Sequence, residues 1–287
     1  MKMKFSLILA TVGRTDEVAR LLASLKAQRY RDFELIVVDQ NPDDRLAAVL
    51  FLYKNNFPIL HLRSERGLSR ARNVGLKHIT GDVVAFPDDD CWYPESLLEE
   101  VYHDFTAHPE WDGMTGRSVD ENGVESAFSF GREDGIIDRF SVWQQAISYT
   151  IFLRRRVIDR VGLFDETLGL GSGTKFGSGE ETDYAVRAIK AGFRLYYLPR
   201  LFVHHPHPEE VIDQRVLARS YSYGCGMGRV LSKHRYPAWF KARALIRPLG
   251  GVFVSLSKFA TPKAALHWQR CIGRVRGLCS RNFKGTA

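Results

Sequence analysis

The chain has 287 residues, of which 45% are hydrophobic and 12% aromatic, so it can bury a full core as one large domain or as a domain with an appendage. This composition excludes an intrinsically disordered chain. The cysteines form no CxxC pair and no metal-ligand spacing, which favours a reducing, cytoplasmic compartment. They are Cys91, Cys225, Cys271 and Cys279.

The net charge of +8 is unevenly distributed. From Arg215 onward there are 15 Lys and Arg residues and neither Asp nor Glu, which leaves 26 basic and 33 acidic residues in the first 214. An acidic body with a strongly basic tail indicates two parts with different partners. We predict a main domain over residues 1–208, with halves at 1–110 and 111–208, and a basic helical extension over 209–287.

The first residues resemble a short signal peptide, because two lysines precede an apolar run. The run ends after Val12 without a small-residue cleavage site and charged helix sequence follows, so we interpret it as a first core strand. No uninterrupted apolar stretch approaches the ~20 residues that a membrane-spanning helix needs.

Strand and helix patterns alternate through the first half of the chain. Short apolar runs predict strands at 5–10, 34–40, 58–62 and 82–86. Helical spacing predicts a helix capped by Thr15, one opened by Asp43 or Asp44, one capped by Ser69, and one over 95–103. This alternation is typical of a doubly wound, mostly parallel α/β sheet with helices on both faces.

After residue 110 the alternation weakens. We predict strands at 114–119, 127–130, 148–153 and 193–199, and helices at 155–161 and 180–190. The second helix follows a glycine-rich loop over 169–179, which we expect to be mobile, and Ser178 is its expected cap. From Glu209 the pattern is helical and basic to the end.

Polar residues follow the predicted strands at the sheet edge where ligands bind in doubly wound folds. Thr11 and Arg14 follow the first strand, Asp39 ends the second, and three aspartates follow the fourth. No GxGxxG motif follows the first strand, which argues against a dinucleotide cofactor.

The aspartates Asp88, Asp89 and Asp90 form either a solvated acidic turn or a cation site. We favour the cation site, because a divalent cation takes hard oxygen ligands and relieves the repulsion among adjacent carboxylates. Alternate residues of an extended segment share a face, so we expect Asp88 and Asp90 to act together and Asp89 to point away.

Three histidines follow the last predicted strand, at 204, 205 and 207. One of them is either a further metal ligand or a structural residue, and imidazole would favour Mn²⁺ over Ca²⁺. Arg70 and Arg72, in the first turn of a helix, are either solvated or partners of a phosphate.

Three acids, Glu180, Glu181 and Asp183, open the helix after the glycine-rich loop. Acids in a first turn complement the helix dipole, and an acid beside a loop that closes over a site can serve as a general base. The spacing leaves both interpretations open.

Six stretches, taken in order, resemble family 2 glycosyltransferases with the A-type, nucleotide-diphospho-sugar-binding fold. They are SLILATVGR, FELIVVDQ, GLSRARNVGL, GDVVAFPDDD, VGLFDETLGLGSGTKFGSGEETDYAVRAIKAG and YYLPRLFVHHP. The resemblance covers residues 3–207. It implies a glycosyltransferase catalytic domain that moves a sugar with inversion from a nucleotide-diphospho-sugar to a hydroxyl of a glycan, polysaccharide or lipid-linked acceptor.

The resemblance also implies a role for each matching residue. The nucleotide-sugar would be bound by Thr11, Arg14, Asp39, Arg72, Asp88 and Asp89. Mn²⁺ or Mg²⁺ would be held by Asp88, Asp90 and His205. The acceptor loop would use Gly171, Gly173, Gly177, Gly179 and Glu180. The usual Glu-Asp pair of the family is Glu-Glu here, which places Glu181 as catalytic base and leaves Glu180 and Asp183 as other candidates.

Two other function classes explain less of the sequence. A metal-dependent nucleotidyltransferase also needs carboxylates at a sheet edge, yet no P-loop or glycine-rich phosphate motif follows the first strand. A non-enzymatic binder of nucleic acid would use the basic tail, which has no RNA-binding signature. The tail is either an amphipathic element on an anionic membrane surface or a set of helices on the body with a solvated basic face.

Overall fold

The computed structural model describes residues 3–127, 130–207 and 211–280. Its contacts divide these residues into two compact units. The sheet unit contains residues 3–66, 70–164 and 184–207, and the helical unit contains residues 67–69, 165–183 and 211–280. The helical unit therefore joins the glycine-rich loop to the C-terminal extension. The predicted division at residue 208 stays a prediction about separately folding domains.

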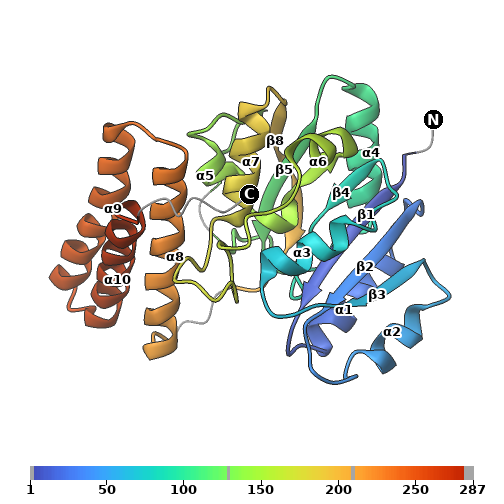
Figure 1. Cartoon of the computed structure of the whole chain (residues 1–287), viewed down its shortest axis with the longest axis horizontal. Coiled ribbons are helices and arrows are strands. Elements are labelled where there is room, and N and C mark those ends of the chain that lie inside the picture. The colour runs from blue at the N-terminus through green and yellow to red at the C-terminus, as the bar shows by residue number, and fades with distance from the viewer. Residues whose placement is uncertain (1–2, 128–129, 208–210, 281–287) are drawn as a thin grey trace. The chain divides into compact units, whose positions relative to one another are not determined.

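A mixed sheet of eight strands, in the order β3-β2-β1-β4-β7-β5-β8-β6, forms the centre of the sheet unit (Figure 1). The strands are β1 Phe5–Thr11, β2 Phe33–Asp39, β3 Ile59–Arg63, β4 Val83–Ala85, β5 Gly113–Val119, β6 Gly135–Ile136, β7 Phe152–Arg154 and β8 Leu195–His204. Strands β1 to β4 run parallel, whereas β7 is antiparallel to β4 and β5, and β6 is antiparallel to β8. The predicted α/β class is confirmed.

Helices cover both faces of this sheet. On one face, α1 (Asp16–Lys26), α2 (Ala47–Tyr53) and α4 (Leu97–Ala107) pack on side chains such as Leu7, Leu35 and Val83. On the other, α3 (Leu68–Leu76), α5 (Val142–Gln145), α6 (Arg155–Val161) and α7 (Glu180–Lys190) pack on Ile8 and Ile36. Burial on both faces explains why the central strands are apolar without alternation.

The predicted starts of α1 and α7 agree with the structure, whereas α2 and α3 begin at other residues than predicted, and some expected side-chain caps do not form. Thr15 precedes α1, but its side chain makes no capping hydrogen bond. Helix α2 begins at Ala47 and not near Asp43. Ser69 lies inside α3, and its hydroxyl donates to the carbonyl oxygen of Leu168 at 2.7 Å. Ser178 likewise donates to the carbonyl of Tyr223.

One predicted strand also needs correction. The pattern at 148–153 contains a 3₁₀ turn, Ser148–Thr150, before the short strand β7, because the chain bends where the sheet ends. The strand predicted at 127–130 includes residues 128–129, which lie outside the described residues. The strand predicted at 193–199 is the first part of the longer β8.

The extension forms three helices, α8 (Gln214–Lys233), α9 (Ala238–Ser257) and α10 (Thr261–Leu278), drawn from orange to red in Figure 1. The side chain of Asp213 caps α8 by accepting a hydrogen bond from the backbone N–H of Val216. Among the described residues, none of the helices is long and apolar enough to cross a bilayer.

Helices α8 and α10 touch through four glycines. Gly224 and Gly228 of α8 face Gly273 and Gly277 of α10, each pair four residues apart. A Cβ at Gly228 would lie 2.2 Å from the carbonyl oxygen of Arg274. Only residues without a side chain allow the two backbones to approach this closely, so the glycine spacing sets how the two helices pack.

We expect Gly228→Ala to lower the free energy of unfolding by about 1–3 kcal/mol, because the added methyl group forces α8 and α10 apart. Gly250→Ala in α9 is the matched control. A Cβ there meets nothing within 4 Å, so the change should stabilise the helix by about 0.5–1 kcal/mol. Urea unfolding followed by circular dichroism measures both. Equal stabilities of the two variants would contradict the close packing.

Candidate active site

The strand register brings the predicted donor-binding residues to one edge of the sheet. Thr11 at the end of β1 is paired with Asp39 at the end of β2. On the other side of β1, Ala10 forms a bridge with Asp88 just beyond β4. Three parallel strands therefore end side by side, and their polar residues lie within reach of one another.

The three aspartates do not alternate along an extended segment, as the sequence-based expectation required. The chain turns after Asp88, whose carbonyl oxygen accepts a hydrogen bond from the N–H of Cys91 at 3.2 Å. The alternation rule holds only for extended backbone, so it does not decide which of these three carboxylates share a face. Arg72 contacts Asp88, whereas Arg14 contacts both Asp89 and Asp90.

The carboxylate of Asp88 faces the buried guanidinium of Arg72, and Asp88 Oδ1 lies 3.2 Å from Arg72 Nη2. Asp88 also accepts a hydrogen bond from the hydroxyl of Ser148 at 3.3 Å. The guanidinium lies between the rings of Phe86 and Phe164, 5.7 and 5.6 Å from their centroids. Despite the charge of Arg72, burial and the neighbouring carboxylates raise the pKa of Asp88 to about 6. The pocket therefore favours added positive charge near this carboxylate.

Asp89 and Asp90 share one guanidinium. Arg14 Nη1 lies 2.6 Å from Asp89 Oδ1 and 2.5 Å from Asp90 Oδ2. The hydroxyl of Thr11 donates to Asp89 at 2.7 Å, and Nε2 of His205 lies 3.1 Å from Asp90 Oδ1. Although burial acts in the opposite direction, the His205 and Arg14 contacts hold the pKa of Asp90 well below its usual range.

The structure distinguishes the two adjacent histidines. His205 faces Asp90, and its ring stacks on Tyr149 with centroids 4.8 Å apart. Although burial opposes it, the contact with Asp90 raises the pKa of His205. His204 instead stacks on Trp92, and its Nδ1 lies 3.0 Å from the carbonyl oxygen of Asp120. Of these two histidines, His205 contacts the aspartate cluster, whereas His204 contacts Trp92, Phe202 and Asp120.

Asp39 is fully buried at the end of β2. One carboxylate oxygen accepts the backbone N–H of Asn41 at 2.8 Å, and the other lies 3.1 Å from His61 Nε2 and 3.0 Å from Arg63 Nη1. The side chain of Asn41 in turn accepts the N–H of Gly13. Asp39 thus connects the residues after β1 and β2 to the end of β3.

The cluster fits a divalent cation that takes part of its ligands from a substrate. Within the described residues, no group of three His, Cys, Asp or Glu side chains is arranged to hold a metal ion by itself. Asp90 Oδ1 and His205 Nε2 nevertheless lie 3.1 Å apart, so a carboxylate oxygen and an imidazole nitrogen are neighbours here. Mg²⁺ and similar cations commonly bind through one or two protein ligands together with phosphate oxygens and water.

The remaining predicted residues lie in the helical unit. Glu180 is 5% exposed, and its carboxylate lies close to Gly169, where an added Cβ would approach to 3.1 Å. Asp183 is fully buried, whereas Glu181 between them is partly exposed. Of the three acids in this first turn, Glu181 is the most accessible to a substrate.

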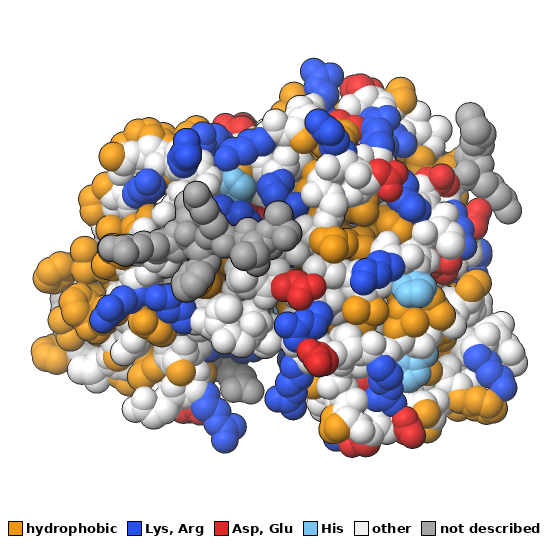
Figure 2. Space-filling view, viewed as in Figure 1, with side chains coloured by type: hydrophobic (Ala, Val, Ile, Leu, Met, Phe, Trp, Pro, Cys, Tyr) orange, Lys and Arg blue, Asp and Glu red, His pale blue; other side chains and the backbone are white. Residues whose placement is uncertain are grey.

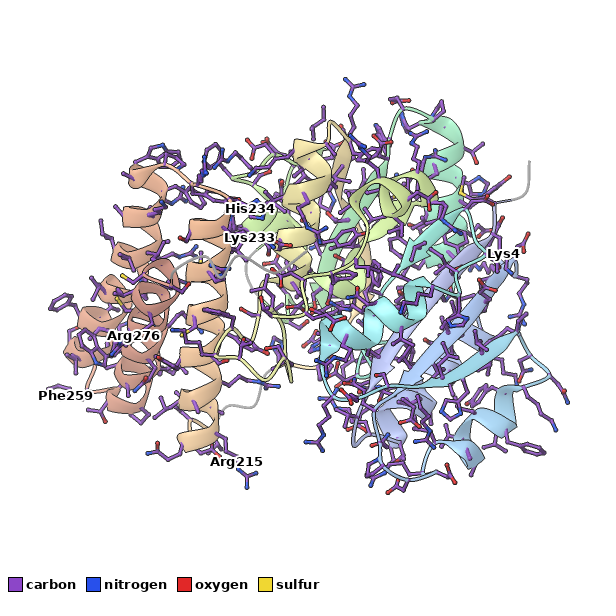
Figure 3. The ribbon with its side chains drawn as sticks, viewed as in Figure 1. Lys4, Arg215, Lys233, His234, Phe259 and Arg276 are labelled. Carbon is purple, nitrogen blue, oxygen red and sulfur yellow. The ribbon has the colours of Figure 1, made fainter. Side chains whose placement is uncertain are left out.

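Asp183 is held by two residues at the C-terminal end of α8, Lys233 and His234 (Figure 3). Lys233 Nζ lies 2.7 Å from Asp183 and 2.7 Å from Asp165, and His234 Nε2 lies 2.8 Å from Asp183. Charged hydrogen bonds of this length are strong when buried. The extension therefore anchors the first turn of α7, in which Glu181 lies.

Hydrogen bonds also hold the predicted acceptor loop to α8. Gly177 donates to the carbonyl oxygen of Ser222 at 3.2 Å, and a Cβ there would lie 2.2 Å from the Ser222 hydroxyl. Gly171, Gly173 and Gly179 have positive φ angles of 70°, 74° and 90°, which a side chain would strain.

Sequence reasoning did not identify several residues of this arrangement: Ser148, Tyr149, Arg63, Lys233 and His234. Tyr149 and Ser148 were assigned to a strand, and the two α8 residues to a uniformly basic tail. No local pattern marks them, because their partners are distant in the sequence. The best available signal was a single Lys-His pair in a segment otherwise dominated by arginine.

The chain is similar in sequence to known glycosyltransferases. A pre-mycofactocin glycosyltransferase of Mycobacterium tuberculosis is 28% identical over 240 residues, which cover 80% of this chain and 48% of that protein. The chain thus spans about half the length of this relative. Glycosyltransferase AglE of Haloferax volcanii is 23% identical over 70% of this chain and 66% of its own length.

Solved structures share the fold at low sequence identity. The mannosyltransferase PcManGT from Pyrobaculum calidifontis, in complex with GDP-Man and Mn²⁺, superimposes with a TM-score of 0.68 at 15% identity, covering 97% of this chain and 88% of that one. Residues 1–349 of Staphylococcus aureus TarS, in complex with UDP-GlcNAc, give 0.64 at 18% identity, covering 96% and 92%. The sequence model described as "Glycosyl transferase family 2" matches residues 6–161, more than half of the chain. The chain belongs to glycosyl transferase family 2.

Proposed function

We propose that this protein is an inverting, metal-dependent glycosyltransferase that moves a sugar from a nucleotide-diphospho-sugar to an acceptor hydroxyl. The observation that carries the proposal is the aspartate cluster at the ends of β1, β2 and β4, in which Asp90 faces His205. The named activities of the relatives and the donors in the titles of the solved neighbours support the same reaction class.

The donor would bind at the ends of these strands. Asp39 presents a buried carboxylate next to Thr11, and such a group accepts hydrogen bonds from a base or ribose. Arg14 and Arg72 already neutralise the aspartates, and their guanidinium groups suit phosphate oxygens as well. Diphosphate would therefore compete with the carboxylates for these two cations.

Mn²⁺ or Mg²⁺ would be held by Asp90 and His205, with Asp88 as the nearest further carboxylate of the turn. When bound, the cation would neutralise negative charge on the leaving diphosphate. The chain's own contribution is to hold His205 in place by stacking on Tyr149 and to keep Asp90 ionised through Arg14. Both contacts favour a preorganised pair of metal ligands, which keeps its orientation and charge in the absence of the donor.

Glu181 would serve as the general base. It takes the proton of the acceptor hydroxyl as the oxygen attacks the anomeric carbon. The bond from that carbon to the diphosphate oxygen breaks, its electron pair leaves with the nucleoside diphosphate, and the configuration inverts. Partial exposure supports Glu181 over the buried Glu180 and over Asp183, whose carboxylate is engaged by Lys233 and His234.

We expect Glu181→Gln to lower kcat by about 10²–10⁴-fold, because the amide cannot accept the proton. Binding of the nucleoside diphosphate should be unchanged, as measured by calorimetry. Glu166→Gln, an exposed glutamate of the preceding loop, is the matched control and should keep its turnover. Near-normal transfer by the Glu181 variant would remove this residue from the role.

We expect His205→Ala to weaken Mn²⁺-dependent binding of a nucleoside diphosphate by at least about tenfold, since a ligand of the cation is lost. His207→Ala removes a histidine that pairs with Asp120 at 3.1 Å and should leave this affinity nearly unchanged. Calorimetric titration with and without Mn²⁺ measures both. Equal losses in the two variants would argue against a metal site at His205.

Release of pyrophosphate in place of nucleoside diphosphate during turnover would indicate a nucleotidyltransferase.

We expect Lys233→Met to lower the free energy of unfolding by roughly 2 kcal/mol and to lower kcat with little change in the donor KM, because the anchor of the first turn of α7 is lost. Lys233→Arg should restore most of both. Lys263→Met changes an exposed lysine of α10 and should affect neither. A loss of stability with an unchanged kcat would limit the Lys233 contacts to a structural role.

A further inference from the structure

Helix α9 has apolar residues on both of its faces. One face, with Phe240, Ala244 and Pro248, is buried within the helical unit. The opposite face carries Trp239, Ile246 and Phe253, seven residues apart and 57%, 65% and 72% exposed. A surface helix of a soluble protein normally has a polar outer face, so the outer face of α9 departs from this pattern.

The exposed apolar residues continue to the end of the helix and into the following turn. Val254 and Leu256 are 55% and 50% exposed, and Phe259, in the turn before α10, is 92% exposed (Figure 3). Figure 2 shows hydrophobic side chains gathered over this part of the helical unit. Single exposed apolar residues are ordinary, but six large ones on one helix and the turn after it indicate an interaction surface.

We call this surface the α9 face. It consists of Trp239, Ile246, Phe253, Val254, Leu256 and Phe259.

Positive charge borders the α9 face. Arg243 and Arg247 are exposed on α9, and Lys258 follows its last turn. No Asp or Glu occurs from Arg215 to the end of the chain, so α9 and α10 contain no carboxylate side chain to neutralise these residues. This surface combines an apolar centre with three exposed cations, Arg243, Arg247 and Lys258.

Two further arginines, Arg270 and Arg274, are influenced by the charge of Arg247. Burial is the main cause that lowers the pKa of Arg270, and the charge of Arg247 is the second cause. Burial and the charges of Arg270 and Arg247 lower the pKa of Arg274 to about 10. The cations of α9 and α10 therefore repel one another, and a polyanionic surface would relieve that repulsion.

We propose that the α9 face docks on an anionic lipid bilayer, with Trp239, Ile246 and Phe253 at the boundary between headgroups and acyl chains and Arg243 and Arg247 at the lipid phosphates. An interfacial helix of this kind combines aromatic and aliphatic residues with flanking Lys and Arg. The cytoplasmic leaflet is the anionic one, so the protein would act at the cytoplasmic face of the membrane. This inference stands apart from the transfer chemistry.

Other occupants fit the surface less well. A second copy of the chain would place two identical cationic borders opposite each other across a twofold axis, which costs free energy. A nucleic acid would use the arginines, but its interfaces are polar and leave large aliphatic groups such as Ile246 without a role. A bilayer uses the apolar centre and the cationic border together.

The test is co-sedimentation of the full-length protein with vesicles of phosphatidylcholine alone and of phosphatidylcholine with phosphatidylglycerol. We expect binding to the anionic vesicles that weakens with added salt. The double variant Ile246→Ser/Phe253→Ser should bind them about tenfold more weakly or worse, because its apolar contribution is lost. Turnover with a water-soluble acceptor should stay at the level of the unchanged protein.

The matched control is Phe51→Ser/Leu52→Ser, which removes two exposed apolar residues of α2 that are 63% and 75% exposed. It should keep full vesicle binding. The proposal is overturned by absence of binding to anionic vesicles, or by equal binding of the two double variants. It is also overturned if Ile246 and Phe253 are required for concentration-dependent dimerisation or for oligonucleotide binding while vesicles are not bound.

Discussion

Three consecutive carboxylates at the end of a buried strand are the constraint on which the rest of this site depends. Water reaches them only in part, so the protein must supply positive charge. Arg14 comes from beyond β1, Arg72 from α3 and His205 from beyond β8. Neutralising the turn therefore ties together segments that are far apart in the sequence, and the same cations and carboxylates then suit a diphosphate and its metal ion.

The helical unit contains a second charge constraint of opposite sign. From Arg215 to the end of the chain there is no acidic residue, and Lys233 and His234 find their partners in Asp165 and Asp183, which precede the extension. The arginines of α9 and α10 find no such partners in the extension sequence. One part of the basic tail thus stabilises the proposed base, while another remains available to an external anionic surface.

The parallel half of the sheet and most of its polar edge could be predicted, because buried strands and their polar ends are local patterns. Thr11, Asp39 and the aspartates lie where the pattern placed them. Errors arose where one side chain has several possible partners. Thr15 precedes α1 but its side chain makes no capping hydrogen bond, and Ser69 lies inside α3 with its hydroxyl donated to Leu168. The partners of Asp89, Thr11 and Arg14, likewise became clear only from the structure.

The sequence by itself determined the fold class, the family and the identity of the residues at the sheet edge, since these depend on periodicity and on motifs within a few residues. Only the tertiary structure decided which histidine faces Asp90, which acid of α7 is accessible, and which face of α9 is exposed. These three outcomes depend on burial and on pairing between distant segments. Physical neighbours of that kind are set by packing, and no local pattern records them.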